Sequence, residues 1–210
     1  MRLLSQGVRE NDHRGWLDTL KGIFADLTEG DRQQAGNPSY PTRPFRRMRR
    51  LRQAAGDGSI YAVDGGGTVC YAVMALRAKE KAGAILNGLQ FGCLGIGVPF
   101  AIAAKPARPE KRVIVVSGDG SFGLNAMGFD AARRHGVPIV CAVGDGRAWG
   151  SAKHSQELCC DVDRVCGTGL GRRTTSGWSK PWAVTGSSSP GTRRSCRPSK
   201  GPCDRASPLA

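Results

Sequence analysis

The sequence predicts an α/β fold in which a parallel sheet carries helices on both faces. Two apolar, β-branched runs, at 113–116 and 138–143, have the composition of strands that are buried on both sides. A segment of helical character separates them, and Gly136 and Pro138 end it. A right-handed crossover then brings the two strands side by side and parallel.

Periodicity and turn signals predict the other elements. In chain order they are a helix over 16–27, a linker over 37–44, a helix over 48–55, a strand over 59–63, helices over 69–78 and 100–104, an exposed turn over 105–111, and a helix over 125–135. In the last helix, Leu124, Met127 and Ala131 are spaced to form one buried face.

Two glycine–aspartate loops follow the two central strands, and each carries one carboxylate. Asp119 lies in the loop 118–120 and Asp145 in the loop 144–146. Neighbouring parallel strands end at the same edge of a sheet, where α/β proteins bind ligands. Carboxylate oxygens suit Mg²⁺, which usually shares its coordination sphere with phosphates. The alternative is that both loops only turn the chain, as glycine and aspartate often do.

Backbone amides near these carboxylates are candidates for phosphate binding. Gly120, Ser121 and Phe122 open a helix, so their N–H groups have no helical partner and can meet a phosphate. A second glycine loop, at 64–68, follows the first predicted strand and offers the same kind of contact. The alternative there is a dinucleotide-binding fingerprint, but the required glycine spacing and ribose-binding acid are not met cleanly.

These loops together resemble the signature of thiamine-diphosphate enzymes. The surrounding residues are similar to the acetolactate-synthase-like branch, which includes oxalyl-CoA decarboxylase and 2-hydroxyacyl-CoA lyase. The similarity covers roughly residues 15–171 and is strongest over 60–156. It implies that the sheet belongs to a thiamine-diphosphate-binding fold.

The resemblance also implies a metal site. Asp119 matches a magnesium ligand, Asp145 matches a second side-chain ligand that is usually Asn in the family, and Arg147 matches the residue whose backbone carbonyl completes the set. A carboxylate at Asp145 still suits magnesium but adds a negative charge beside the diphosphate. Gly128 also replaces a common acidic residue, which is expected to lower helix stability.

Further cofactor contacts are implied in the same way. Gly66, Gly67 and Thr68 match residues that contact the diphosphate, and Leu94 matches the bulky apolar residue that holds the cofactor bent. For Leu94 the alternative is an ordinary buried leucine in a loop before a helix. His154 is a single histidine, and we assign it no catalytic role.

The expected function is thiamine-diphosphate and magnesium binding by a fragment of an enzyme that makes or cleaves C–C bonds of 2-keto acids or acyl-CoA substrates. In the family, a separate pyrimidine-binding domain supplies the glutamate that activates the cofactor. No glutamate of this chain lies in the corresponding context, so we expect little or no activity from the chain alone. The alternatives are a remnant that binds no ligand and a basic nucleic-acid-binding protein.

The chain is expected to divide into three parts. Residues 1–57 match a helical and linker remnant of a preceding domain, and residues 58–171 match a partial cofactor domain whose sheet is incomplete at its C-terminal end. Residues 172–210 are basic and rich in Ser, Arg, Pro and Gly, with no helical or strand period. Codons can be chosen from Thr174 onward so that a shifted reading frame encodes a family-like ending, and the encoding DNA tests that hypothesis.

The net charge and the cysteine content limit which binding partners and which cellular compartment are expected. The net charge is +14, and residues 172–210 supply half of it. A second basic block, at 43–52, could contact successive phosphates of a nucleic acid. No nucleic-acid-binding module surrounds it, so we favour the alternative that it is a solvent-exposed helix face. The eight cysteines lack metal-site spacing, and no signal peptide or membrane span is evident, which predicts reduced thiols in a cytoplasmic protein. The family implies a homodimer or tetramer.

Overall fold

The sheet at the centre of the molecule has four parallel strands. The computed structural model describes residues 12–36, 44–56, 58–76 and 85–171. The strands are β1 (Ile60–Asp64), β2 (Ile85–Leu86), β3 (Val113–Gly118) and β4 (Val140–Gly144). Their order is β2-β1-β3-β4, and every pair is parallel. The predicted α/β class is therefore confirmed. In the described part of the chain, β4 has a strand neighbour on one side only.

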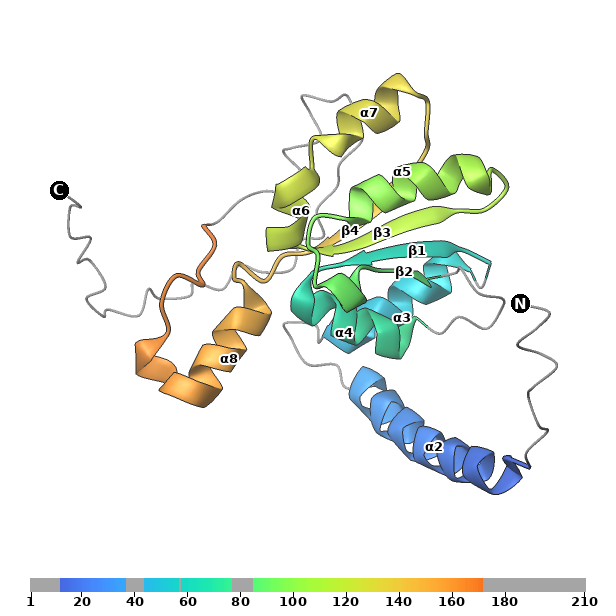
Figure 1. Cartoon of the computed structure of the whole chain (residues 1–210), viewed down its shortest axis with the longest axis vertical. Helices are drawn as coiled ribbons and strands as arrows, with labels where there is room; N and C mark the ends of the chain where they lie inside the picture. Colours follow the sequence, from blue (N-terminus) through green and yellow to red (C-terminus); the bar gives the residue numbers. More distant parts are fainter. Residues whose placement is uncertain (1–11, 37–43, 57, 77–84, 172–210) are drawn as a thin grey trace, which may run out of the picture.

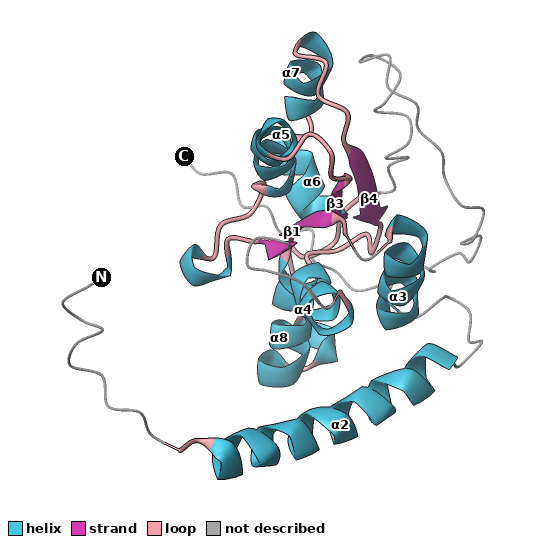
Figure 2. Ribbon diagram, turned by 90° about the vertical axis from the view of Figure 1, so that its right-hand side faces the viewer, coloured by secondary structure: helices cyan, strands magenta, loops and turns pink. Residues whose placement is uncertain are grey.

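Helices cover both faces of this sheet, which gives three layers (Figure 1). The helices are α2 (Arg14–Gly36), α3 (Pro44–Ala55), α4 (Gly66–Ala75), α5 (Gly97–Ala107), α6 (Asp119–Asn125), α7 (Gly128–Arg134) and α8 (Gly150–Cys160), with short 3₁₀ turns at Leu89–Phe91 and Val162–Arg164. Helices α3 and α4 lie on one face, and α5 and α7 lie on the other, as the view in Figure 2 also shows.

Alternating strand residues supply the two cores between these layers. Val63 and Val116 are less than 2% exposed and pack towards α3 and α4, together with Met48 and Val69. Ala62, Val113 and Val115 point to the opposite face and pack with Val98, Ala101 and Phe129 from α5 and α7. Because both faces of β1 and β3 are covered, residues 60–63 and 113–116 of these strands form continuous apolar runs rather than alternating with polar residues.

The predicted helix over 125–135 is wrong in its boundaries and in its buried face. The segment forms two short helices, α6 and α7, with the break at Ala126 and Met127. Leu124 and Met127 are 55% and 62% exposed, and the buried residues are instead Ala126, Phe129 and Ala132. A break between two helices resets the angular phase of the side chains, so a single 3.6-residue period cannot describe both.

Other boundaries differ by less. Helix α2 extends to Gly36, beyond the predicted 16–27. Helix α5 begins inside the glycine loop and continues to Ala107, so part of the predicted turn at 105–111 is helical. The predicted domain boundary falls at residue 57. Residues 37–43 of the predicted linker and the tail at 172–210 lie outside the described residues, and Pro44, the last residue of that linker, begins α3. Within the described residues, no helix combines the length and apolar character that a membrane span requires.

Candidate cofactor and metal site

The two aspartates follow glycines that are paired across the sheet. Gly118 at the end of β3 is in register with Gly144 at the end of β4. Asp119 is the first residue of α6, and Asp145 begins the loop after β4. Both residues therefore lie at the carboxyl edge of the sheet, on neighbouring parallel strands. Asp145 is close enough for its negative charge to raise the pKa of Asp119.

Asp119 has a carboxylate oxygen without a partner. Its Oδ1 accepts a hydrogen bond from the Gly120 N–H at 3.1 Å, whereas its Oδ2 is buried and has no hydrogen-bond partner among the described residues. Desolvation by burial raises the pKa of Asp119, and the charge of Asp145 adds to that increase. The hydrogen bond from Gly120 and the nearby backbone N–H of Arg147 lower the pKa and so act in the opposite direction. A cation at Oδ2 would satisfy the unpartnered oxygen and offset the repulsion from Asp145.

Arg147 holds an uncommon backbone conformation beside Asp119. Its φ is +53°, in the left-handed region that side-chain-bearing residues rarely adopt. Its carbonyl accepts a hydrogen bond from the Leu170 N–H at 2.8 Å. A carbonyl oxygen has two lone pairs, so a metal ion at this atom would share it with Leu170.

The first glycine loop lies against the Asp119 loop. Gly66, Gly67 and Thr68 form the first turn of α4, directly after the N-cap residue Gly65, whose φ is +101°. A Cβ at Gly118 would lie only 3.1 Å from the Thr68 hydroxyl, so this hydroxyl sits beside the end of β3. The structure thus brings the residues of both loops to one edge of the sheet.

The first turn of α6 offers backbone amides rather than side chains. A Cβ at Gly120 would lie 2.6 Å from the ring of Trp149, so that ring covers the glycine. Ser121 is 3% exposed, and its hydroxyl lies close to Gly65. The ring of Phe122 packs on Phe129, with a centroid distance of 6.1 Å. A ligand at this helix would therefore meet the N–H groups of these residues.

Leu94 lies on the loop that joins the Leu89–Phe91 turn to α5. Its side chain is 41% exposed, so the interpretation as an ordinary buried leucine is wrong. The next residue, Gly95, has a φ of +83°, and a Cβ there would lie 2.9 Å from the Cβ of Leu124. The Leu94 loop therefore packs tightly against α6, which carries Asp119 at its other end.

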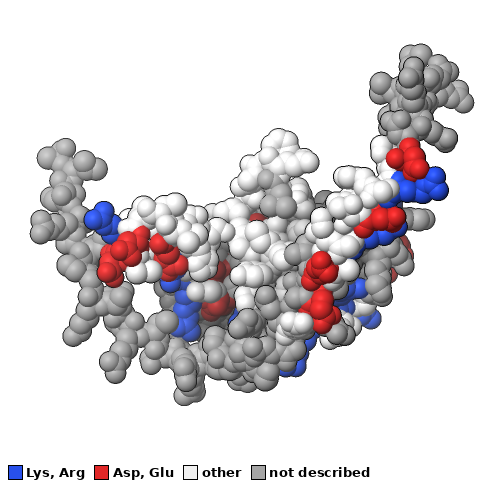
Figure 3. Space-filling view, turned by 90° about the horizontal axis from the view of Figure 1, so that it is seen from below, with Lys and Arg blue, Asp and Glu red and all other residues white. Residues whose placement is uncertain are grey.

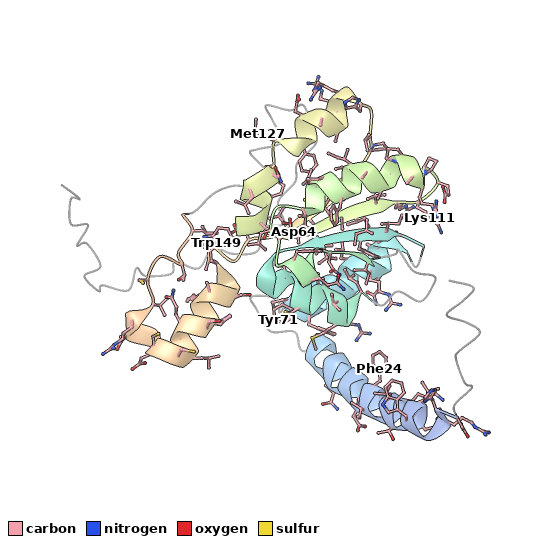
Figure 4. All side chains as sticks on the ribbon, in the orientation of Figure 1. Phe24, Asp64, Tyr71, Lys111, Met127 and Trp149 are labelled. Atoms are coloured by element: carbon pink, nitrogen blue, oxygen red, sulfur yellow. The ribbon has the colours of Figure 1, made fainter. Side chains whose placement is uncertain are left out.

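Three residues at this edge were missed by sequence reasoning. Asp64, at the end of β1, accepts backbone hydrogen bonds from the Leu94 loop, and Figure 4 shows it at the end of the sheet that also holds Trp149. Ser151, in the first turn of α8, has its hydroxyl against Gly66. Asp64 could have been identified from the sequence, because an acidic residue stands there between an apolar strand and three consecutive glycines. Trp149 and Ser151 gave none, because their contacts are with residues distant in sequence.

The remaining polar groups do not form a competing site. His154 is exposed and contacts Glu157 on the same helix at 2.9 Å. Among the described residues, no three or more His, Cys, Asp or Glu lie close enough together to hold a metal. A surface depression lined by Arg49, Arg52, Gln53 and Gly56 lies at the end of α3, which leads into the opposite, amino-terminal edge of the sheet.

The basic block at 43–52 is largely helix α3, and its apolar residues are used in the core. Phe45 and Met48 are buried between α3 and α4, while Arg47 and Arg50 are exposed. On the face shown in Figure 3, basic side chains of the described residues are interspersed with acidic ones. On this face, the described residues therefore form no continuous positive surface of the kind expected for nucleic-acid binding.

Comparison with known proteins shows similarity to one protein family. The family model described as "Thiamine pyrophosphate enzyme, C-terminal TPP binding domain" matches residues 64–179. A probable acetolactate synthase of Mycobacterium bovis is 32% identical over 151 residues, which are 72% of this chain and 27% of that protein. 2-Hydroxyacyl-CoA lyase 2 of Homo sapiens is 29% identical over 153 residues, which are 72% of this chain and 24% of that protein. The chain thus spans about a quarter of the length of these relatives.

A solved structure supports the fold. The thiamine diphosphate-dependent 4-hydroxybenzoylformate decarboxylase of Rhodococcus jostii RHA1 aligns with a TM-score of 0.62 at 20% sequence identity, over 69% of this chain and 27% of that one. At this level of identity the likeness concerns the arrangement of helices and strands.

Proposed function

Because this chain belongs to the family of thiamine pyrophosphate enzymes, as their C-terminal TPP-binding domain, we propose that it binds thiamine diphosphate through a magnesium ion at the carboxyl edge of its sheet. The observation that carries the metal proposal is the buried, unpartnered Oδ2 of Asp119 beside the loop of Asp145. Two carboxylates and a backbone carbonyl at Arg147 are hard oxygen donors, which magnesium prefers, and diphosphate oxygens complete such a sphere.

The backbone around the metal site supplies the proposed diphosphate contacts. The first turns of α4 and α6 both begin at this edge, so the N–H groups of Gly66, Gly67, Ser121 and Phe122 are available to phosphate oxygens, whereas the Gly120 N–H, which donates to Asp119 Oδ1, would be shared with a phosphate. The hydroxyl of Thr68 lies beside Gly118 and can donate a further hydrogen bond. The partly exposed Leu94 is proposed to contact the organic part of the cofactor and to hold it bent.

The named relatives suggest an activity for the full-length enzyme of which this chain is proposed to be a part. They are named as an acetolactate synthase, a 2-hydroxyacyl-CoA lyase and a sulfoacetaldehyde acetyltransferase. We therefore propose a parent enzyme that makes or cleaves C–C bonds of 2-keto acids or acyl-CoA substrates. When bound, thiamine diphosphate serves as the electron sink for such chemistry, and this domain binds, orients and shields its diphosphate end.

The chain alone is proposed to have little or no turnover. The matched region corresponds to the C-terminal TPP-binding domain. The resemblance implies that the glutamate which activates the cofactor belongs to another domain. We also propose that the parent enzyme forms a homodimer or tetramer and is located in the cytoplasm. The described cysteines are all free thiols, which agrees with a reducing compartment.

Isothermal titration calorimetry tests the binding proposal. We expect thiamine diphosphate to release or absorb heat on binding when magnesium is present, and to show no binding after the metal is removed with EDTA. Absence of magnesium-dependent binding would favour the remnant that binds no ligand. A salt-sensitive shift of DNA without thiamine diphosphate binding would favour the nucleic-acid alternative, because counterion release makes only that interaction steeply dependent on salt.

A further inference from the structure

Asp64 is a buried carboxylate that holds the Leu94 loop by two backbone hydrogen bonds. It is 3% exposed. Its Oδ1 accepts the Gly95 N–H at 3.1 Å and its Oδ2 accepts the Gly97 N–H at 2.9 Å. These donors lie 31 and 33 residues further along the chain, so the contact fixes a distant loop to the end of β1. Among the described residues, Asp64 forms no ion pair that would otherwise account for a buried charge.

A buried carboxylate at this position is costly unless its hydrogen bonds are well made. Removing a charge from water has a large free-energy cost, which charge-assisted hydrogen bonds or an ion pair must offset. An apolar side chain would fill the same space without that cost. The carboxylate therefore specifies the position of the loop more than it contributes to the packing of the core.

The same loop is held from its other side by α6. The carbonyl of Gly95 accepts a hydrogen bond from the Asn125 side-chain amide at 2.8 Å. The peptide groups around Gly95 are thus fixed by β1 through Asp64 and by α6 through Asn125. A Cβ at Gly97 would lie 2.9 Å from the Cβ of Asp64, so the loop approaches too closely for a larger residue.

This arrangement links the proposed apolar cofactor contact to the proposed metal contact. Leu94 directly precedes Gly95, and Asp119 and Asn125 are the first and last residues of α6. We propose that Asp64 and Asn125 are positioning residues that hold Leu94 at a fixed place relative to Asp119, so that the thiamine part and the diphosphate part of one cofactor are recognised together. The inference rests on the proposed function and assigns these two residues a role within it.

The test compares thiamine diphosphate with inorganic pyrophosphate, which lacks the thiamine part. Calorimetry of the full chain with magnesium measures the affinities for thiamine diphosphate and for inorganic pyrophosphate. In Asp64→Asn, the amide keeps the shape but turns one acceptor into a donor that faces a backbone N–H. We expect it to weaken thiamine diphosphate binding about tenfold or more, as the loss of a charged hydrogen bond implies, and to change pyrophosphate binding by less than about twofold.

Two further variants keep the test decisive. Asn125→Ala changes a surface side chain, so it is suited to the test even if Asp64→Asn fails to fold, and we expect a selective loss of about three- to fivefold. Asp130→Asn is the matched control, since Asp130 lies on α7 and pairs with Arg134 at 2.7 Å, and we expect no change for either ligand. Equal losses for both ligands, or no loss for either, would overturn the positioning role.

A double-mutant cycle tests whether Asp64 acts through Leu94. If it does, Asp64→Asn should have little further effect on thiamine diphosphate binding in a Leu94→Ala background, because the positioned group is already absent. Fully additive effects would contradict the proposal. A wild-type chain that binds neither ligand would refute the proposed function itself, which separates that failure from a failure of the positioning role.

Discussion

Strands β3 and β4 end in the same Gly–Asp–Gly sequence but in different surroundings. Five of the six residues of β3 are buried, whereas residues 141–144 of β4 are only partly exposed and Val140 at its start is 61% exposed. Asp119 follows the central strand β3 and has a buried oxygen. Asp145 is exposed and follows β4, the outer strand among the described residues. Gly120 is covered by Trp149, and Gly146 has nothing within 4 Å of where its Cβ would be.

The difference shows that position in the sheet, rather than the local motif, decides what each loop can do. A loop after a central strand can desolvate a carboxylate, which strengthens its interaction with a cation. A loop after an outer strand leaves its carboxylate in water, where its charge is screened. The two aspartates are therefore expected to contribute unequally to the proposed metal site.

The largest expected effect is that of Asp119→Asn. Replacing partners outside the direct ligand set already lowers metal affinity about 10–100-fold, so loss of this ligand's charge should weaken magnesium-dependent thiamine diphosphate binding by at least about 100-fold. Calorimetry measures this loss. Thermal unfolding is the control: because Asn removes a desolvated charge, the midpoint should stay the same or rise, and a falling midpoint would indicate a structural role instead.

Gly120→Ala and Gly146→Ala form a matched pair. The new methyl group at Gly120 would overlap the Trp149 ring, and overpacking of this kind should lower the free energy of unfolding by about 1–3 kcal/mol. The same change at Gly146 meets open space, so an effect within about 0.5 kcal/mol is expected. Urea unfolding distinguishes the two. Equal effects would show that the two loops are not packed as differently as described.

Asp145→Asn should have a smaller effect. The amide oxygen remains a hard ligand, and the change removes a negative charge that faces both Asp119 and the proposed diphosphate. Exposed charge pairs contribute about 0.2–1 kcal/mol, so we expect an affinity for thiamine diphosphate within about fivefold of wild type and shifted towards tighter binding. A loss as large as that of Asp119→Asn would contradict the unequal roles.

The smallest expected change concerns a thiol in β4. Burial raises the pKa of the Cys141 thiol to about 12, with a further contribution from the charge of Asp64, so this thiol stays protonated at pH 8. Because the thiolate is the reactive form, a maleimide should label exposed Cys70 well before Cys141. Peptide mapping after timed labelling measures the order. Faster labelling of Cys141 would show that β4 opens to solvent and exposes its thiol.

The sequence predicted the parts of this arrangement that depend on local pattern. Strand composition and glycine loops placed Asp119 and Asp145 after neighbouring parallel strands. The division of the following helix into α6 and α7 was not predicted. The packing of Phe129 with residues of α5 and the sheet decides which side of α7 is buried, and this tertiary contact is not visible in the sequence. Gly128 was interpreted as a weakness of the helix, yet a Cβ there would lie 2.8 Å from Val98, so the glycine permits close packing of α7 on α5.

Asp64 shows where sequence reasoning stops. Its two hydrogen-bond partners become neighbours only when α5 packs on the sheet, and no spacing within the chain indicates that contact. Long-range contacts between a side chain and a backbone group leave no periodic trace, so the positioning of the Leu94 loop required coordinates.

The ring of Trp149 on Gly120 gives this edge of the sheet a built-in optical reporter. Indole emission responds to the polarity and motion of its surroundings, and this indole lies beside the residue that follows Asp119. Occupation of the neighbouring loop should alter the fluorescence without any added dye. A Trp149→Phe variant identifies the part of the signal that comes from this side chain.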